Sequence, residues 1–324
     1  MSQSKVRTAE FVSPKHPDKI CDYIADSILD AHLALDPLAR VAVEVMGGHS
    51  LITLNGEITS SAEVDYESVV KKIVGEEYKV LSGISKQSPE IARGVDVGGA
   101  GDQGIMVGYA TSDTASLVPK EYELARKLCQ EIFKVYPYDG KVQVTLSVEK
   151  IECVVASFQN SKSQELETLT RSLIQSEKYL INPAGEWQQG GFDADSGLSG
   201  RKLVVDAYGP HVPIGGGSFS GKDATKVDRS GAYYARKVAV DLLEKSRASG
   251  NSAKEVLVKI AYAIGVVEPV MAIAYIDGVE KDITNDYDFS PRTICKLLEL
   301  DKPQFAKLSE WGHFGRENIW DKVF

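Results

Sequence analysis

The sequence GGGSFSGKDATKVDRS, residues 215–230, brings four glycines, two lysines and two aspartates together in one short stretch. Glycines allow tight turns in which backbone amides point at an anion. Lys222 and Lys226 add positive charge, and Asp223 or Asp228 can hold a hard divalent cation such as magnesium. The stretch therefore predicts a site for a polyphosphate and its metal ion. A helix is predicted to follow it, from Asp228 to Glu244.

Two other interpretations of this stretch remain open. Its glycines and Lys222 are spaced almost as in a P-loop, but Asp223 stands where that motif has a Ser or Thr. Pro210 and Pro213 also interrupt the strand that should lead into a P-loop. The other interpretation is a flexible, solvated loop that binds nothing.

The composition predicts an ordinary globular protein. The chain has 324 residues, of which 43% are hydrophobic and 26% charged, so two or three domains are expected. A net charge of −9 disfavours nucleic acid as a partner. The four cysteines form no C-x-x-C pair, which favours reduced thiols over a zinc site or disulfides. The N-terminus lacks an apolar signal region and no apolar run reaches membrane-spanning length, so a cytoplasmic protein without a membrane partner is predicted.

A helix is predicted from Pro17 to about Leu35, because isoleucines recur there at helical spacing. Four aspartates at intervals of four residues, from Asp18 to Asp30, lie on the opposite ridge. Solvent exposure is the default prediction for the later ones. Asp18 differs, since it shares the helix entry with His16, where free backbone amides attract anions.

The segments after this helix alternate as strands. Residues 40–46 place Glu44 on the polar face of one strand. Asn55 and Gly56 predict a hairpin turn, with Glu57 just after it. Ser60 and a glutamate three residues later resemble a capping box. Residues 203–208, LVVDAY, predict a further strand.

The motifs taken together resemble one known family, the S-adenosylmethionine synthetases, also called methionine adenosyltransferases. The matching stretches occur in family order over almost the whole chain: HPDK, GEIT, KQSP, GAGDQG, the strand that Lys141 opens, INP, SGLSGRK, residues 215–230, IGVVEP and GHFGRE. Two features depart from the family pattern. Ser13, Pro14 and Lys15 precede His16 in place of a Ser-Glu-Gly segment, and the loop between Val95 and Gly99 is short.

The resemblance implies a site for ATP and L-methionine, with two Mg²⁺ ions and a K⁺ ion. The residues that would contact the triphosphate and support its departure are His16, Lys141, Arg201, Lys202, Lys222 and Lys226. Those that would ligate metal ions are Asp18 and Asp228 for magnesium and Glu44 for potassium. Those that would bind the remaining substrate groups are Glu57, Gln87 and Asp102 for methionine, Asp195 near the ribose and sulfur, and Trp187 and Ile264 for adenine.

The chemistry of that reaction agrees with this set of residues. A thioether sulfur needs no base to attack the ribose C5′, whereas triphosphate leaves with growing negative charge. Several cations and metal ions are therefore required around the leaving group. The same cations can then support cleavage of triphosphate to pyrophosphate and phosphate. A phosphotransferase that forms ADP, or a nucleotide-binding regulatory module, stays as an alternative function.

The resemblance also implies an α/β (α+β) fold of three similar domains, each a sheet with helices on one face, related by pseudo-threefold symmetry. The expected segments are residues 1–97, 98–189 and 190–324, with strands that can be exchanged between them. A homodimer, or a dimer of dimers, that shares each site between two subunits is expected as well.

Overall fold

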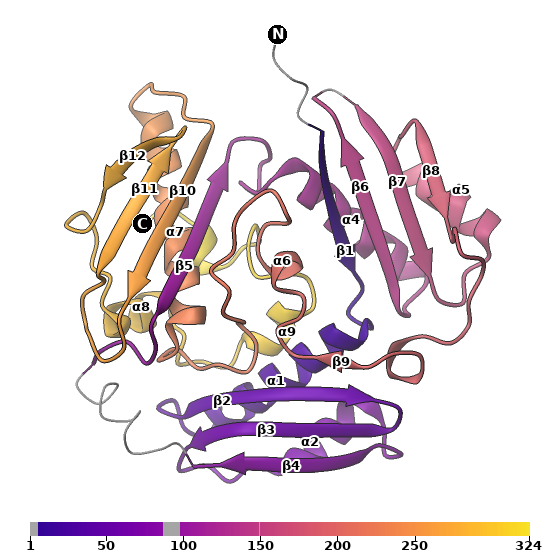
Figure 1. Cartoon of the computed structure of the whole chain (residues 1–324), viewed down its shortest axis with the longest axis horizontal. Coiled ribbons are helices and arrows are strands. Elements are labelled where there is room, and N and C mark those ends of the chain that lie inside the picture. The colour runs from indigo at the N-terminus through magenta and orange to yellow at the C-terminus, as the bar shows by residue number, and fades with distance from the viewer. Residues whose placement is uncertain (1–5, 87–97, 149) are drawn as a thin grey trace.

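The computed structural model describes residues 6–86, 98–148 and 150–324 (Figure 1). Its described part contains three four-stranded sheets arranged around a common centre, with the longer helices on their inner sides (Figure 1). Apolar side chains on the inner faces of these sheets form the core, while polar side chains alternate with them on the outer faces. The predicted fold class is confirmed.

The first two units share one order of elements: a long helix, two antiparallel strands, a shorter helix and a final parallel strand. In the first unit these elements are α1 (Pro17–Leu33), β2 (Arg40–Gly48), β3 (Leu51–Thr59), α2 (Tyr66–Val74) and β4 (Lys79–Ser85). In the second unit they are α4 (Lys120–Val135), β6 (Gly140–Leu146), β7 (Ile151–Phe158), α5 (Ser163–Leu173) and β8 (Lys178–Ile181).

The third unit differs in its last strand. It consists of α7 (Val227–Ala248), β10 (Glu255–Tyr262), β11 (Met271–Ile276), β12 (Val279–Asp282) and α8 (Pro291–Leu298). Asp277 and Gly278 both have positive φ, 48° and 81°, as the central residues of a two-residue hairpin often do. This turn makes β12 antiparallel to β11. The helix α8 then follows the last strand instead of preceding it.

Each sheet takes its fourth strand from the chain that leads into another unit. The strand β1 (Arg7–Val12) leads into α1 but pairs with β6, and β5 (Gly104–Thr111) leads into α4 but pairs with β10. The short strand β9 (Gly197–Leu198) lies between the second unit and α7 and pairs with β2. The exchange is therefore cyclic, and no unit completes its own sheet.

The remaining elements fill the space between the three units. They are the 3₁₀ helix η1 (Gly191–Asp193), α6 (Leu203–Asp206), α9 (Phe305–Ser309) and the 3₁₀ helix η2 (Ile319–Asp321). Among the described residues, none of the helices is both long and apolar enough to cross a membrane.

The predicted hairpin at Asn55 and Gly56 is wrong. Both residues lie inside the continuous strand β3, and the chain turns instead at His49 and Ser50, with φ of 50° and 65°. A Cβ atom at Gly56 would lie 2.0 Å from the Ala42 carbonyl oxygen. This glycine therefore permits a close approach of strands, which the sequence does not distinguish from a turn.

Two other local predictions also fail. Residues 203–206 form the helix α6, since Leu203 and Val205 point into the core between units. The cap of α2 is Asp65, which accepts a hydrogen bond from the Ser68 amide at 3.1 Å. Ser60 instead donates to a carboxylate oxygen of Asp36 at 2.9 Å.

The aspartate ridge of α1 is buried, in contrast to its predicted exposure. Asp22 and Asp26 have no exposed surface, because loops of the C-terminal segment and α9 pack over this side of the helix. The apolar stripe and the acidic ridge of α1 both face the interior of the protein. A prediction from amphipathicity, which places only the apolar face inside, therefore misassigns the acidic ridge.

Candidate functional site

His16 stands at the N-terminal end of α1. Its backbone is extended, with φ −63° and ψ 136°, and its Nδ1 atom accepts a hydrogen bond from the Asp18 amide at 3.2 Å. Burial, followed by the charge of Lys202, lowers the pKa of His16 to about 4. The imidazole is therefore neutral at pH 7. Because Nδ1 accepts, the proton lies on Nε2, which is free to donate outward.

Asp18 forms the centre of the first charge cluster. Its Oδ2 atom lies 2.5 Å from the Lys202 Nζ, and its Oδ1 atom accepts from the Leu198 amide at 3.0 Å and lies 3.6 Å from the Arg201 Nε. Although burial opposes ionisation, the bonds from Lys202 and Leu198 hold the pKa of Asp18 below its ordinary value. The carboxylate is therefore ionised and is only 2% exposed.

Lys141 and Asp195 belong to the same neighbourhood, since the charges of both act on the His16 imidazole. Lys141 lies on the outer face of β6, and its Nζ is 2.6 Å from the Glu10 Oε2 on β1. We name the α1-entry cluster as His16, Asp18, Lys141, Asp195, Arg201 and Lys202.

One edge of β2 holds two glycine-rich motifs side by side. At one end, β9 pairs with Met46 and Gly47, and the Ser199 amide donates to the Val45 carbonyl at 2.9 Å. Further along, the Val43 amide donates to the Gly221 carbonyl at 2.9 Å. The SGLSGRK and GKDATK motifs are therefore both aligned by one strand, although about twenty residues separate them in sequence.

A second charge cluster lies beside this edge. Lys222 Nζ is 2.6 Å from the Asp228 Oδ2, and the Ser199 hydroxyl donates to the Glu44 carboxylate. Burial of that carboxylate raises the pKa of Glu44, and both Lys222 and Asp228 are among the charges that act on it. We name Glu44, Ser199, Lys222 and Asp228 the β2-edge cluster. Ser199 is absent from the sequence-based site, and its signal is a hydroxyl between the glycines that precede Arg201.

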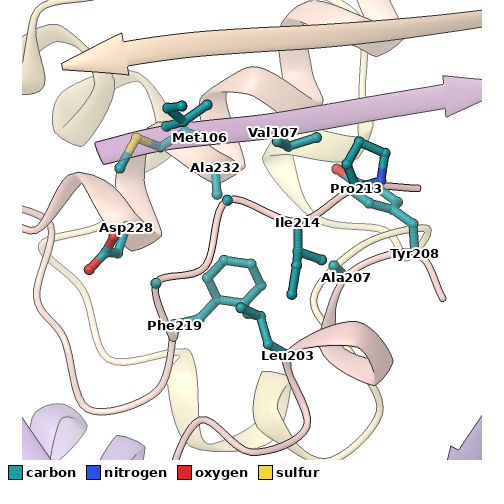
Figure 2. Close-up of a pocket in the computed structure, with 13 residues that line it drawn as sticks. Met106, Val107, Leu203, Ala207, Tyr208, Pro213, Ile214, Phe219, Asp228 and Ala232 are labelled. Carbon is teal, nitrogen blue, oxygen red and sulfur yellow. The ribbon is translucent and has the colours of Figure 1, made fainter. Parts of the chain in front are cut away.

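The glycine-rich stretch 215–230 is packed against the protein from Phe219 onward, whereas Gly215 and Gly216 are exposed. Figure 2 shows Phe219, Leu203 and Ile214 gathered in an apolar pocket below β5, with Asp228 at its edge. Phe219 is 6% exposed, and a Cβ at Gly217 would collide with the Asp228 carboxylate. The interpretation as a loop solvated along its whole length is therefore wrong. The P-loop interpretation is wrong too, because the helix α6 precedes the loop where that motif has a strand.

Lys226 has a different partner from the other predicted cations. Its Nζ lies 2.5 Å from the Asp223 Oδ1, which also accepts from the Val41 amide at 2.6 Å. Asp223 is therefore a buried link between this loop and β2, whereas the sequence left it as a candidate metal ligand.

The contacts described for Asp102 and Glu57 involve neither the α1-entry cluster nor the β2-edge cluster. Asp102 is exposed on the turn before β5, where its own carboxylate accepts from the Gln103 amide at 2.7 Å. The amide of the adjoining Gly101 donates a hydrogen bond to the Thr225 carbonyl at 3.2 Å. Glu57 lies on the outer face of β3, opposite Ala42. Gln87 lies outside the described residues.

The two residues predicted to bind adenine belong to opposite sides of the chain. Trp187 follows β8 and is half-buried over Gly190, whereas Ile264 follows β10 and is 51% exposed. In Figure 1, β8 lies at the right of the molecule and β10 at the left. The strands that these two residues follow therefore belong to different sheets of one chain.

The donor atoms fit magnesium bound to a substrate phosphate. Asp18 and Asp228 offer hard carboxylate oxygens, and each is held by a lysine ammonium group. Within the described part of the chain, no three or more His, Cys, Asp or Glu side chains are grouped to hold a metal on their own. Magnesium typically binds to one or two carboxylates plus phosphate and water oxygens, which this arrangement matches.

Comparison with known protein families decides the wider assignment. Sequence models of the S-adenosylmethionine synthetase N-terminal, central and C-terminal domains match residues 4–91, 97–187 and 189–322. The chain belongs to the S-adenosylmethionine synthetase family. Members of this family are methionine adenosyltransferases, so the enzyme class predicted from the ordered motifs is confirmed.

Several S-adenosylmethionine synthetases resemble the chain over nearly its whole length. The S-adenosylmethionine synthase of Sorangium cellulosum (strain So ce56) is 40% identical over 98% of this chain and 87% of its own. That of Desulforudis audaxviator (strain MP104C) is 38% identical over 98% and 95%. The solved structure of an S-adenosylmethionine synthetase from Campylobacter jejuni, described as unusual, has a TM-score of 0.86 and 31% identity, covering 98% of this chain and 97% of that one.

Proposed function

We propose that this protein joins ATP and L-methionine into S-adenosylmethionine, releases triphosphate and hydrolyses it to pyrophosphate and phosphate. The observation that carries the proposal is the alignment of SGLSGRK and GKDATK along β2 beside the α1 entry, in a member of the S-adenosylmethionine synthetase family. The two charge clusters, which together contain Lys141, Arg201, Lys202 and Lys222, would then be bridged by a polyphosphate.

The first step needs a leaving-group site more than a base. The methionine sulfur attacks C5′ with its own lone pair, the S–C5′ bond forms, and the C5′–O bond breaks with its electron pair on triphosphate. The His16 Nε2–H is suited to donate to that oxygen, because the neutral imidazole is fixed by its bond to the Asp18 amide. No proton transfer from His16 is required.

The lysines exchange partners when the nucleotide binds. Lys202 and Lys222 are held by Asp18 and Asp228, and phosphate oxygens would replace these carboxylates around the ammonium groups. The two carboxylates would then hold the two magnesium ions. Magnesium supplies neutralisation of the phosphate charge as it develops. Arg201, Lys141 and Lys226 would add contacts to the same phosphates.

Glu44 and Ser199 would hold the potassium ion. A monovalent cation suits an oxygen-donor pair that already contains a single carboxylate, and it would lie beside Lys222. Its charge would support the ionised form of Glu44, whose pKa burial raises.

The methionine and adenine groups would be bound with help from a second subunit. Asp102, Glu57 and Gln87 are the proposed methionine contacts, with Asp195 near the sulfonium, and Trp187 and Ile264 the proposed adenine contacts. Trp187 follows β8 and Ile264 follows β10, in different units of one chain, which supports a site completed by a partner. The outer face of the β2 sheet also exposes Leu198, Met46 and Leu81 in one row across the strands, with Thr53 between Met46 and Leu81, and this row is suited to pairing between two copies.

Product identification tests this function. Incubation with ATP, L-methionine, Mg²⁺ and K⁺ is expected to yield S-adenosylmethionine, pyrophosphate and phosphate, and omission of methionine should abolish the sulfonium product. Lys222→Ala should lower kcat/KM by about a hundredfold, because it removes one positive charge that stabilises the departing triphosphate. Lys302→Ala, at an exposed ion pair with Glu299, is the matched control and should be neutral. Formation of ADP without a sulfonium product would establish the phosphotransferase alternative instead.

A further inference from the structure

The aspartate ridge of α1 binds the loops that carry the site cations. Asp18, Asp22 and Asp26 each accept a hydrogen bond from a backbone amide far away in sequence. The donors are Leu198 at 3.0 Å, Gly200 at 2.9 Å and Gly221 at 2.8 Å. Because these aspartates are spaced four residues apart, their carboxylates form a row of acceptors along one side of the helix that binds two loops.

The donors of Asp22 and Asp26 stand directly before functional side chains. Gly200 precedes Arg201 and Lys202, and Gly221 precedes Lys222. Both glycines have positive φ, 77° and 79°, so each starts a turn from which the following side chains project. A small shift of either amide would therefore displace the phosphate-binding cations.

Burial of the Asp22 and Asp26 carboxylates costs free energy of desolvation. Asp22 and Asp26 are fully buried, and each is paired with a buried cation, Lys19 in the first case and Arg229 in the second. Like charges at an interval of four on one helix also repel each other. Replacing a buried ion pair by well-packed apolar side chains is often neutral or stabilising in proteins. The presence of both carboxylates points to a role beyond holding the fold.

We propose that Asp22 and Asp26 are positioning residues for the triphosphate site, which they set by fixing the Gly200 and Gly221 amides relative to Asp18. The proposal rests on the proposed function, because it concerns the cations assigned to the triphosphate. Asp22 and Asp26 touch no substrate atom. They act through the backbone that carries Arg201, Lys202 and Lys222.

Asp30 provides a matched control on the same ridge. It accepts from the backbone amides of Gln304, Phe305 and Ala306 at 2.9, 3.0 and 2.9 Å. These bonds cap α9 and involve neither cation loop. Asp30→Ala should therefore lower the melting temperature while leaving triphosphate binding unchanged.

The test measures binding of inorganic triphosphate to the full chain by calorimetry, with folding checked by circular dichroism. Asp22→Ala should raise the triphosphate Kd and the KM for ATP by about tenfold or more, because misplacement by a fraction of an ångström is costly at such sites. The KM for methionine should change less than the KM for ATP. Asp22→Asn keeps an acceptor oxygen for Gly200 while removing the same charge and the second acceptor, which binds Lys19. Because Asp206 still holds Lys19 at 2.5 Å, the triphosphate Kd of Asp22→Asn should stay near that of the wild type.

Several outcomes would overturn the positioning role. Wild-type triphosphate affinity in Asp22→Ala, equal weakening in Asp30→Ala, or equal weakening in Asp22→Asn would each do so. If Asp22→Ala does not fold, Asp22→Ser replaces it, since its hydroxyl is too short to reach the Gly200 amide and leaves room for water. Failure of the wild-type protein to bind triphosphate would count against the proposed function itself.

Discussion

At the residue scale, one hydrogen bond gives His16 two tasks. The bond from the Asp18 amide to Nδ1 caps α1, and it also fixes the proton on Nε2. A serine or asparagine would serve the cap alone. Histidine adds a neutral donor aimed away from the helix, which is the requirement of a leaving oxygen beside several lysines.

The pH dependence of stability tests the neutral state of His16. Its pKa in the folded protein, about 4, lies below the ordinary 6.5, so its contribution to stability is present above pH 6.5 and is lost as the pH falls towards 4. His16→Asn keeps a cap acceptor but does not titrate. The wild-type advantage in free energy of unfolding should shrink by at least about 1 kcal/mol between pH 7 and pH 4.5. Urea unfolding at several pH values measures it, and a difference independent of pH would contradict the assignment.

At the element scale, β2 organises the site because it has partners along both edges. β3 covers one edge, while β9 and the residues around Gly221 share the other. This sharing requires the GKDATK loop to approach the strand closely. A Cβ atom on Gly221 would lie 2.0 Å from the Val43 carbonyl oxygen.

Two glycines of the same loop separate backbone strain from lack of space. Gly221 and Gly216 both have positive φ, 79° and 101°, but a Cβ at Gly216 would meet nothing within 4 Å. Gly216→Ala should therefore cost only about 1 kcal/mol of backbone strain. Gly221→Ala should cost at least about 3 kcal/mol, because the strand edge must move. Urea denaturation of both variants gives the comparison, and similar losses would show that crowding at β2 is unimportant.

The sequence predicts elements better than their surroundings. The helices α1 and α7 and the alternation of β2 follow directly from apolar periodicity. Gly56 is misassigned because a close strand contact and a turn both require glycine. The acidic ridge is misassigned because its partners are backbone amides of distant loops. Four aspartates repeated at intervals of four residues are the available signal, since like charges at this spacing repel each other on an exposed helix.

The spacing of motifs in the sequence identifies the candidate lysines of the site, but it does not identify the side chains with which they interact. Lys202 and Lys222 are found in charged clusters, as a phosphate site requires, whereas Lys226 pairs with Asp223, only three residues before it. That Asp223 also bonds to the Val41 amide depends on the distant strand β2, which the local spacing does not indicate. Ser199 lacks charge or a motif of its own. Its place opposite Glu44 depends on the pairing of β9 with β2, which connects residues from different units.

At the scale of the whole molecule, the two proposed adenine contacts give a sharp test of a site shared between subunits. Trp187→Ala and Ile264→Ala change contacts that belong to different units of one chain, and each should abolish most activity on its own. If each site combines Trp187 of one subunit with Ile264 of the other, mixed dimers contain one site with both lesions and one intact site. Random reassociation should then restore about a quarter of wild-type activity.

The control for this experiment pairs two lesions from one cluster. Lys202→Ala mixed with Arg201→Ala should stay inactive, because every site in the mixed dimer keeps one lesion. Subunit exchange is verified with differently tagged chains. Activity that returns equally in both mixtures, or in neither, would exclude the shared arrangement.

The cyclic exchange of leading strands also sets a timetable for the growing polypeptide on the ribosome. β1 is synthesised first but stays unpaired until β6 is made. One edge of β2 stays uncovered until β9 is made. β5 is completed last, since its partner β10 begins at Glu255. Open strand edges of this kind are templates for wrong pairing. β1, β2 and β5 all lack these partners until β6 begins at Gly140, so the unfinished chain is at its most vulnerable at that stage. A transcript truncated before the codon for Glu255 would release a polypeptide in which β5 has no sheet to join.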